Sequence, residues 1–428
     1  MEPAAHEHRR RLASNIISLY VLQGLNYLIP LIVLPYLVRT LGMEEYGLVA
    51  FSQAFAQYFA VFTDYGFNFS ATRSIAQSRE DSRAIRNTVL QVFLLKIALM
   101  LIGLILLAII AVLVPRIRQN LWYFLLAFIA VVGNVLFPLW YFQGIERMQY
   151  ISTYTATAKI ISTIFLFILV RGPDDGLWAI GILSTGTLIA GIMGAVTVLY
   201  EVGLGFELPS WQSLRETLAE GWHVFIATAS ISLYTNTNVF LVGLLAGNTQ
   251  AGYFSAADKL IRAMSGALGP ITQAIYPRIS ALAAESRTMA LSLASKSLYW
   301  MSASSLLLSF AVFALAKFIT TILFGANGAA IVPVIHWIAA IPFFIAVSSV
   351  LGIQTMLTFG LDRQFGRILL FSGLFNIAAG VPLIHFIGAQ GAGISVLLTE
   401  ALVTISMAIV LWKNNICILS PGALQSEY

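Results

Sequence analysis

Long apolar runs constrain this chain more than any other feature. A membrane-spanning helix needs about 20 mostly apolar residues to cross a bilayer core about 30 Å thick. Twelve runs of that kind cover residues 13–39, 46–70, 87–114, 121–143, 152–170, 177–201, 222–246, 254–279, 296–319, 331–358, 366–387 and 392–412. They are too continuous for membrane β-strands, which alternate apolar and polar residues over about ten positions. With 59% hydrophobic and 10% charged residues in 428, the chain is predicted to be an all-α integral membrane protein with about 12 transmembrane helices.

The order of the runs predicts two lobes of six helices each. The longest connection, residues 202–221, follows the sixth run, and every other connection is shorter. We therefore predict an N-terminal lobe over 1–205 and a C-terminal lobe over 206–428. Two pairs of glycines have the same spacing in the two halves: Gly42 and Gly47 follow the first run, and Gly247 and Gly252 follow the seventh. Repeated halves with a site between them are typical of transporters.

Positive charge in the connections predicts the orientation. The connections on the side of the termini hold 15 Lys and Arg residues, against 7 on the other side. Because cytoplasmic loops carry the excess of positive charge, both termini are expected in the cytoplasm. This excess accounts for the net charge of +5 without a nucleic-acid partner. A single cysteine and the lack of any zinc-type spacing predict no metal site.

Polar residues inside the apolar runs are the candidates for function. In a bilayer such groups face a neighbouring helix or a wet cavity, since facing lipid costs several kcal/mol. The second run carries a polar stripe at helical spacing, made of Gln53, Gln57, Asp64 and Asn68. The seventh run is the most polar of all, with Ser230, Ser232, Thr235, Asn236, Thr237 and Asn238. Hydrogen bonding between helices without any ligand is the alternative for these hydroxyls and amides.

Charged residues within the runs have two explanations as well. Four of them either serve a function or form structural ion pairs and snorkelling head groups, namely Lys96, Lys159, Asp64 and Glu400. Arg262 has a specific structural rival, because Asp258 lies one helical turn earlier and is able to neutralise it. Prolines inside the runs predict kinks, and they are Pro30, Pro35, Pro138, Pro270, Pro342 and Pro382.

Four segments carry a family resemblance. They are LVRTLGMEEYG (37–47), PLWYFQGIERMQYIS (138–152), AGYFSAADKLIRAM (251–264) and AIYPRIS (274–280). Together they resemble the polysaccharide transporter family, the Wzx-type O-antigen and exopolysaccharide flippases. The resemblance implies the MATE-like fold of the multidrug/oligosaccharidyl-lipid/polysaccharide superfamily. It also implies a substrate of undecaprenyl diphosphate carrying an oligosaccharide, moved from the cytoplasmic to the periplasmic leaflet of the bacterial inner membrane for O-antigen, capsule or exopolysaccharide synthesis.

That substrate assigns expected roles to the polar residues. A diphosphate needs fixed cations beside a wet path, and the candidates are Lys96, Lys159, Lys259 and Arg262. The sugar is expected to contact Asn26, Gln57, Tyr234, Asn236 and Asn238. Asp64 and Glu400 are candidates for coupling transport to H⁺ or Na⁺. No other cofactor and no catalytic residue are expected; the implied partners are the lipid-linked glycan, membrane lipid, a polysaccharide polymerase and a chain-length regulator.

Three alternative functions would each require features that differ from those of this sequence. A lipid II flippase of the same superfamily typically has fourteen helices and an arginine in its first helix, whereas here no charge stands between Arg11 and Arg39. A cation-coupled multidrug antiporter would have a cavity dominated by carboxylates and aromatic residues. A membrane-bound glycosyltransferase or polymerase would need a large loop with clustered carboxylates, and the paired acids Asp174 and Asp175 stand in RGPDDG, which is typical of a turn.

Overall fold

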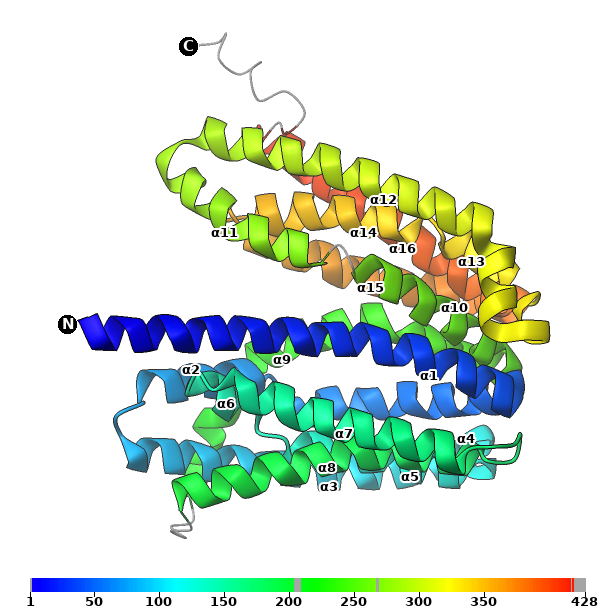
Figure 1. The fold of residues 1–428 in the computed structure, drawn as a ribbon, viewed down its shortest axis with the longest axis horizontal. Coiled ribbons are helices and arrows are strands. Elements are labelled where there is room, and N and C mark those ends of the chain that lie inside the picture. The colour runs from blue at the N-terminus through cyan, green and yellow to red at the C-terminus, as the bar shows by residue number, and fades with distance from the viewer. Residues whose placement is uncertain (1, 204–208, 267–268, 417, 419–428) are drawn as a thin grey trace. The chain divides into compact units, whose positions relative to one another are not determined.

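The computed structural model describes residues 2–203, 209–266, 269–416 and 418, and every regular element within them is a helix (Figure 1). The first half contains α1 (Glu2–Asp64), α2 (Phe67–Gln77), α3 (Ser82–Leu113), α4 (Pro115–Gln119), α5 (Leu121–Leu136), α6 (Leu139–Gly144), α7 (Met148–Leu169), α8 (Gly176–Val202) and α9 (Trp211–Leu245). The second half contains α10 (Asn248–Gly266), α11 (Gly269–Glu285), α12 (Arg287–Phe324), η1 (Gly325–Gly328), α13 (Val332–Ile338), α14 (Ile341–Ser349), η2 (Val350–Met356), α15 (Asp362–Ile387) and α16 (Ala389–Lys413). The prediction of an all-α membrane protein is confirmed.

The predicted membrane spans fall within these helices. Among the described residues, 8 helical stretches are long and apolar enough to cross a membrane, the first being Ser82–Leu113. The other four predicted runs lie in α1, in α9 and in the pair α10 and α11. The total of twelve spans therefore stays a prediction. Large apolar side chains are exposed on these helices, for example Ile105 on α3 at 61% and Leu307 on α12 at 69%, as expected for surfaces that face lipid tails.

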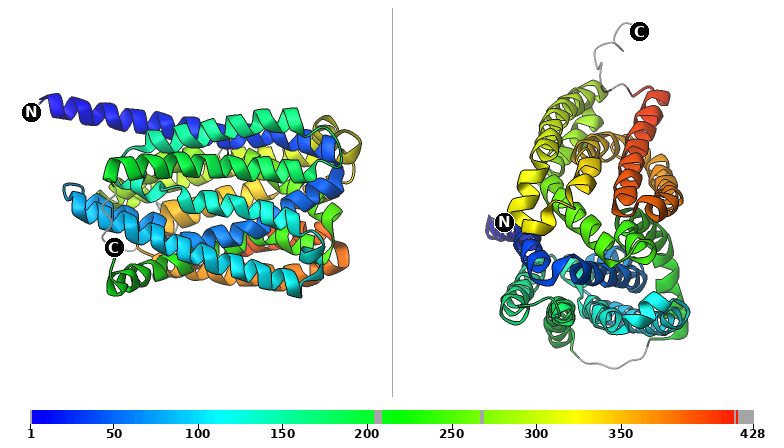
Figure 2. Two further views of the ribbon diagram at one scale, coloured as in Figure 1. Left: turned by 90° about the horizontal axis from the view of Figure 1, so that it is seen from below. Right: turned by 90° about the vertical axis from the view of Figure 1, so that its right-hand side faces the viewer.

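Contacts divide the chain into two compact units, residues 1–232 and 233–428. The predicted lobe boundary between residues 205 and 206 lies outside the described residues and stays a prediction. Within each unit most of the long helices run along a common direction, as the two views of Figure 2 show. In the first unit α8 packs against α5 and α7, and α1 packs against the same two helices. Small residues permit a close approach there: a Cβ atom on Gly191 would lie 2.3 Å from the carbonyl oxygen of Gly133.

Two helical corners occur at the glycines that the sequence comparison of the halves singles out. Gly42 has φ 77° and ψ 174° and divides α1 into two helical segments, so the predicted runs 13–39 and 46–70 are separated by a corner. Gly247 has φ 108° and stands between α9 and α10. Positive φ is easily adopted only by glycine, which gives the two glycines the same conformational role in the two halves.

Two further breaks in the first unit shape the functional site. The helix α1 ends at Asp64, because Tyr65 and Gly66 have φ values of 47° and 79°. Gly66 is also crowded, since an added Cβ would lie 2.8 Å from the Cβ of Val224. The second break separates α5 from α6 at Pro138, which confirms the kink predicted there.

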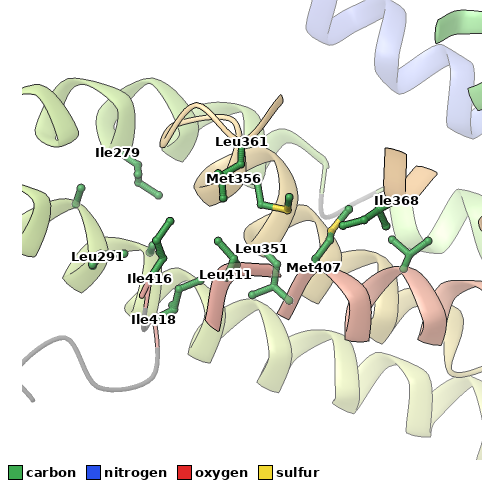
Figure 3. Close-up of a cluster of buried hydrophobic side chains, with 13 residues drawn as sticks. Ile279, Leu291, Leu351, Met356, Leu361, Ile368, Met407, Leu411, Ile416 and Ile418 are labelled. Atoms are coloured by element: carbon green, nitrogen blue, oxygen red, sulfur yellow. The ribbon is translucent and has the colours of Figure 1, made fainter. Parts of the chain in front are cut away.

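A buried apolar cluster of the second unit lies between α11, α12, η2, α15 and α16. Its members include Ile279, Leu291, Leu351, Met356 and Met407, whose side chains lie close together in Figure 3. The element η2 is a π-helical stretch, a form that is rare and often occurs at functional sites. It places Gln354 at 0% exposure, where it accepts a hydrogen bond of 2.8 Å from Ser297 of α12.

Candidate functional site

A buried ion pair joins two helices of the first unit. The ammonium of Lys96, on α3, lies 3.5 Å from Oδ1 of Asp64 at the end of α1. The same ammonium donates a hydrogen bond of 3.2 Å to the backbone carbonyl of Asn134 on α5. The side chain of Lys96 is 3% exposed and that of Asp64 is 26% exposed. The structure therefore brings together a residue expected to bind diphosphate and a residue expected to couple an ion.

Two polar cavities lie beside this pair. The first, about 230 Å³, is lined by Gln57, Ala60, Val61, Asp64, Asn68, Lys96, Asn134, Phe137, Leu139 and Thr228. The second, about 320 Å³, is lined by Gln53, Ala56, Gln57, Ala60, Ala127, Ala130, Val131, Asn134, Leu183, Ser184 and Thr187. Because Gln57, Ala60 and Asn134 line both cavities, the two are neighbours along one face of α1. We call them together the unit 1 cavity.

The chemistry of the unit 1 cavity suits a hydroxylated ligand. Its polar lining consists of amides and hydroxyls with one lysine and one aspartate, and these groups both donate and accept hydrogen bonds. The Oδ1 atom of Asn68 is buried and has no hydrogen-bond partner in the described structure. A buried acceptor without a donor is costly.

A different polar network occupies the second unit. Asn238 of α9 donates a 3.1 Å hydrogen bond to Oδ1 of Asn376 on α15. Asn376 in turn donates to the hydroxyls of Ser395 and Thr399 on α16, at 3.3 and 3.1 Å. All four residues are at most 3% exposed. Asn238 is thus part of a hydrogen-bond network across three helices, and its predicted contact with sugar stays a prediction. Glu400, the next residue on α16, is 7% exposed.

Arg262 forms an ion pair with Asp258, which is the structural alternative to substrate binding by Arg262. Its Nε lies 2.7 Å from Oδ2 of Asp258, one turn earlier on α10. Its Nη2 donates to the backbone carbonyl of Thr235 on α9 at 2.9 Å. The side chain of Arg262 is 43% exposed. These contacts give Arg262 a structural role between α9 and α10.

The remaining predicted site residues are not among the described residues that line the unit 1 cavity. Lys159 on α7 and Lys259 on α10 are half-buried, as is Asn236 on α9. Asn26 and Tyr234 lie in α1 and α9, and their side chains are outside the described part of the structure. Their proposed contacts with substrate stay predictions.

Several lining residues were missed by the sequence analysis. Asn134 contributes its backbone carbonyl to Lys96, and backbone contacts have no side-chain signature. Thr228, Ser184 and Thr187 line the cavities, and the sequence analysis assigned them no role. A helical-face count on the run 177–201 would have grouped Ser184 and Thr187, which are three residues apart. Within the described residues there is no cluster of His, Cys, Asp or Glu suited to hold a metal.

A helical membrane protein in two compact units, with a polar cavity inside one of them, has the architecture of a transporter. Solved transporters share this fold. The lipid II flippase MurJ in an inward closed conformation superimposes with a TM-score of 0.71 at 12% identity, covering 95% of this chain and 90% of that one. A MATE family multidrug resistance transporter in an inward-facing conformation gives 0.61 at 12% identity, covering 94% and 96%. The expected MATE-like fold is confirmed.

The chain belongs to the polysaccharide biosynthesis protein family, whose model matches residues 12–283. A protein of Escherichia coli (strain K12) named "Putative O-antigen transporter" is 37% identical over 407 residues, which are 94% of this chain and 97% of that protein. A protein of Shigella dysenteriae with the same name is 31% identical over 398 residues, or 92% and 98%. The resemblance found in the sequence is thus confirmed, and the chain is a multi-pass membrane transporter and not an enzyme.

Proposed function

We propose that this protein is a flippase for lipid-linked oligosaccharides. It would carry undecaprenyl diphosphate with its oligosaccharide from the cytoplasmic to the periplasmic leaflet by alternating access, supplying repeat units for O-antigen or a related surface polysaccharide. The support comes from the family, from relatives named as O-antigen transporters and from the fold shared with a lipid II flippase.

The observation that carries this proposal is the unit 1 cavity with Lys96 in its wall. A head group of sugar and diphosphate needs both hydrogen-bonding groups and a cation, and it needs them away from lipid. The amides of Gln57 and Asn68 suit sugar hydroxyls, and Lys96 suits a phosphate oxygen. The polyprenyl tail remains in the bilayer, where the exposed apolar helix faces meet it.

The membrane orientation is part of the proposal. Both termini would lie in the cytoplasm of a bacterium, with the protein in the inner membrane, because the loops on that side hold the excess of positive charge. A periplasm-active reporter fused near Ser82 should then be silent. The polysaccharide polymerase and the chain-length regulator are the proposed protein partners on the periplasmic side.

We propose Asp64 as the principal site for a coupling ion, H⁺ or Na⁺. It lines the same cavity as the proposed substrate contacts, so an ion bound there would act directly on the substrate. Glu400 is buried in the second unit and is the second candidate.

Deletion of the gene in a strain with a known surface polysaccharide tests the proposed function. Lipid-linked repeat units should accumulate on the inner leaflet of spheroplasts, and surface polymer should disappear. Normal polymer in the deletion strain would remove the proposal. A deletion strain with intact polymer and increased sensitivity to cationic drugs would favour a multidrug antiporter instead.

A further inference from the structure

The positive charge of Lys96 is already paired with the carboxylate of Asp64 in this structure. Its ammonium, with three N–H donors, lies beside the carboxylate of Asp64 at 3.5 Å and the carbonyl of Asn134 at 3.2 Å. The side chain is 3% exposed, so water is a minor partner. An anion that approaches Lys96 therefore also approaches the negative charge of Asp64, and the attraction and the repulsion offset one another.

Among the described residues that line the first cavity, no other side chain carries a charge that would change this balance. The rest of that lining consists of amides at Gln57, Asn68 and Asn134, a hydroxyl at Thr228, and apolar side chains from α1, from α6 and from Phe137 between α5 and α6. Asp64 and Lys96 are thus the titratable groups among the residues lining it. The net charge beside a bound anion is then about zero when Asp64 is ionised and +1 when it is protonated.

The same cavity offers hydrogen-bonding amides beside the lysine, those of Gln57 and Asn68. A ligand with both an anionic oxygen for Lys96 and hydroxyls for these amides would use both kinds of group. A sugar diphosphate has this combination of groups.

We propose that Asp64 controls whether Lys96 is available to the substrate. When Asp64 is ionised it neutralises Lys96 and the cavity disfavours an anion; when one proton from water joins the carboxylate, Lys96 is released to the anionic group. Proton and anion are then taken up together, and loss of the proton restores the ion pair and expels the anion. This inference rests on the proposed function and adds to it the sign of the coupling between proton and substrate.

The coupling has a physical advantage. A diphosphate carries about two negative charges, and a charge inside the bilayer is costly. A cavity that contributes one unpaired lysine only when the anion is present avoids an isolated buried cation in the empty state. Linkage also requires reciprocity, so the anion must favour protonation of Asp64 as strongly as protonation favours the anion.

The test measures proton uptake on binding. The full-length protein in nanodiscs is titrated with undecaprenyl diphosphate by calorimetry in two buffers of different ionisation enthalpy, at several pH values. Undecaprenol, which lacks the diphosphate, serves as the uncharged ligand control. The ligand's own phosphate titration is removed by comparing the wild type with Asp64→Asn, an isostere of the protonated aspartate that binds the same ligand.

We expect the wild type to take up about one proton more per bound diphosphate than Asp64→Asn does. As the pH rises and Asp64 ionises, the affinity of the wild type for undecaprenyl diphosphate should fall by up to about tenfold per pH unit relative to Asp64→Asn. The reason is that one proton is linked to binding. Asp258→Asn, which removes the carboxylate of the ion pair with Arg262 in the second unit, is the matched control and should keep the proton uptake of the wild type. Adding Lys96→Ala to Asp64→Asn should abolish diphosphate binding.

Equal proton uptake by the wild type and Asp64→Asn overturns the coupling. The wild type, measured across pH, is informative even if a variant fails to fold, because pH-independent binding beyond the ligand's own titration also overturns it. Failure of the wild type to bind undecaprenyl diphosphate at any pH is a different result and contradicts the proposed function itself.

Discussion

Two of the ion pairs in the described part of the structure, Asp258–Arg262 and Asp64–Lys96, have the same kinds of charge and opposite settings. Asp258 and Arg262 are four residues apart on one helix, and the arginine is 43% exposed. Asp64 and Lys96 come from two helices, and the lysine is 3% exposed beside a polar cavity. An exposed pair of the first kind contributes little to stability, typically 0 to about 1 kcal/mol. A buried pair is costly to desolvate, so its presence beside a cavity favours a role in function.

Breaking the buried pair should have the largest effect. Lys96→Ala leaves Asp64, whose side chain is 26% exposed, without its cation, and loss of one partner of a largely buried pair is destabilising. We expect export of surface polysaccharide to be abolished and the amount of protein in the membrane to fall. Immunoblots of membranes and measurement of surface polymer in a complemented deletion strain check both expectations.

The double variant Asp64→Asn, Lys96→Met separates the two losses. It removes both charges, so protein levels should recover toward the wild type while export stays absent. Recovery of export together with protein level would show that the pair is only structural.

Glycine substitutions test how Asp64 is positioned. Gly66→Ala should destabilise the protein by more than about 2 kcal/mol, because positive φ costs an alanine roughly 1 to 2 kcal/mol and the added Cβ meets Val224 at 2.8 Å. Gly360→Ala is the control: its φ of 72° is also positive, but nothing lies within 4 Å of the added Cβ. Thermal unfolding of the purified variants should rank Gly66→Ala below Gly360→Ala. Equal losses would mean that the contact with Val224 does not hold the break in place.

The exposed pair should be far less sensitive. Arg262→Ala removes one ion pair and one hydrogen bond to the carbonyl of Thr235, and we expect a loss of about 1 kcal/mol with export largely retained. The double change Asp258→Ala, Arg262→Ala should be no worse than Arg262→Ala alone. Export that is abolished in both variants, at normal protein levels, would instead assign Arg262 to substrate binding.

The smallest effect is expected at a carboxylate without a cation. Asp175 accepts hydrogen bonds of 2.8 Å from the backbone N–H groups of Arg171 and Gly172, and these bonds lower its pKa. Because the folded-state pKa is depressed, the stabilisation is present above the unfolded value of about 3.9 and is lost as pH falls through the folded value. Asp175→Asn should therefore differ from the wild type slightly in unfolding temperature at pH 7 and not at strongly acid pH. Export should be unchanged, and a clear loss of export would contradict a role confined to the turn.

The sequence predicted what depends on local pattern. The apolar runs, the corner after residue 39, the break at Pro138 and the Asp258–Arg262 pair each follow from composition or from spacing within one helix. The Asp64–Lys96 pair was not predicted, because it depends on how α1 packs against α3 and on a break at Tyr65 and Gly66 within a continuous apolar run. The π-helical stretch at η2 also has no simple pattern, and it sets the buried position of Gln354.

The roles of individual polar residues were harder to predict than their number. Asn238 and Gln57 both stand in polar stripes, yet Asn238 is buried in a network across three helices while Gln57 lines both parts of the unit 1 cavity. The sequence predicts which face of a helix is polar. It does not predict whether that face meets a cavity or another helix, because tertiary packing decides this.

Site-specific photocrosslinking at Gln57 tests the central claim, that the substrate head group occupies the unit 1 cavity. A photoreactive amino acid at Gln57, in cells that make a lipid-linked oligosaccharide with labelled sugars, should capture the labelled sugar. The same amino acid at Ile105, which is 61% exposed on α3 of the same unit, should capture lipid without sugar. Labelled sugar captured at Ile105 as efficiently as at Gln57, or absent from Gln57 in a protein that still exports polysaccharide, would contradict the account.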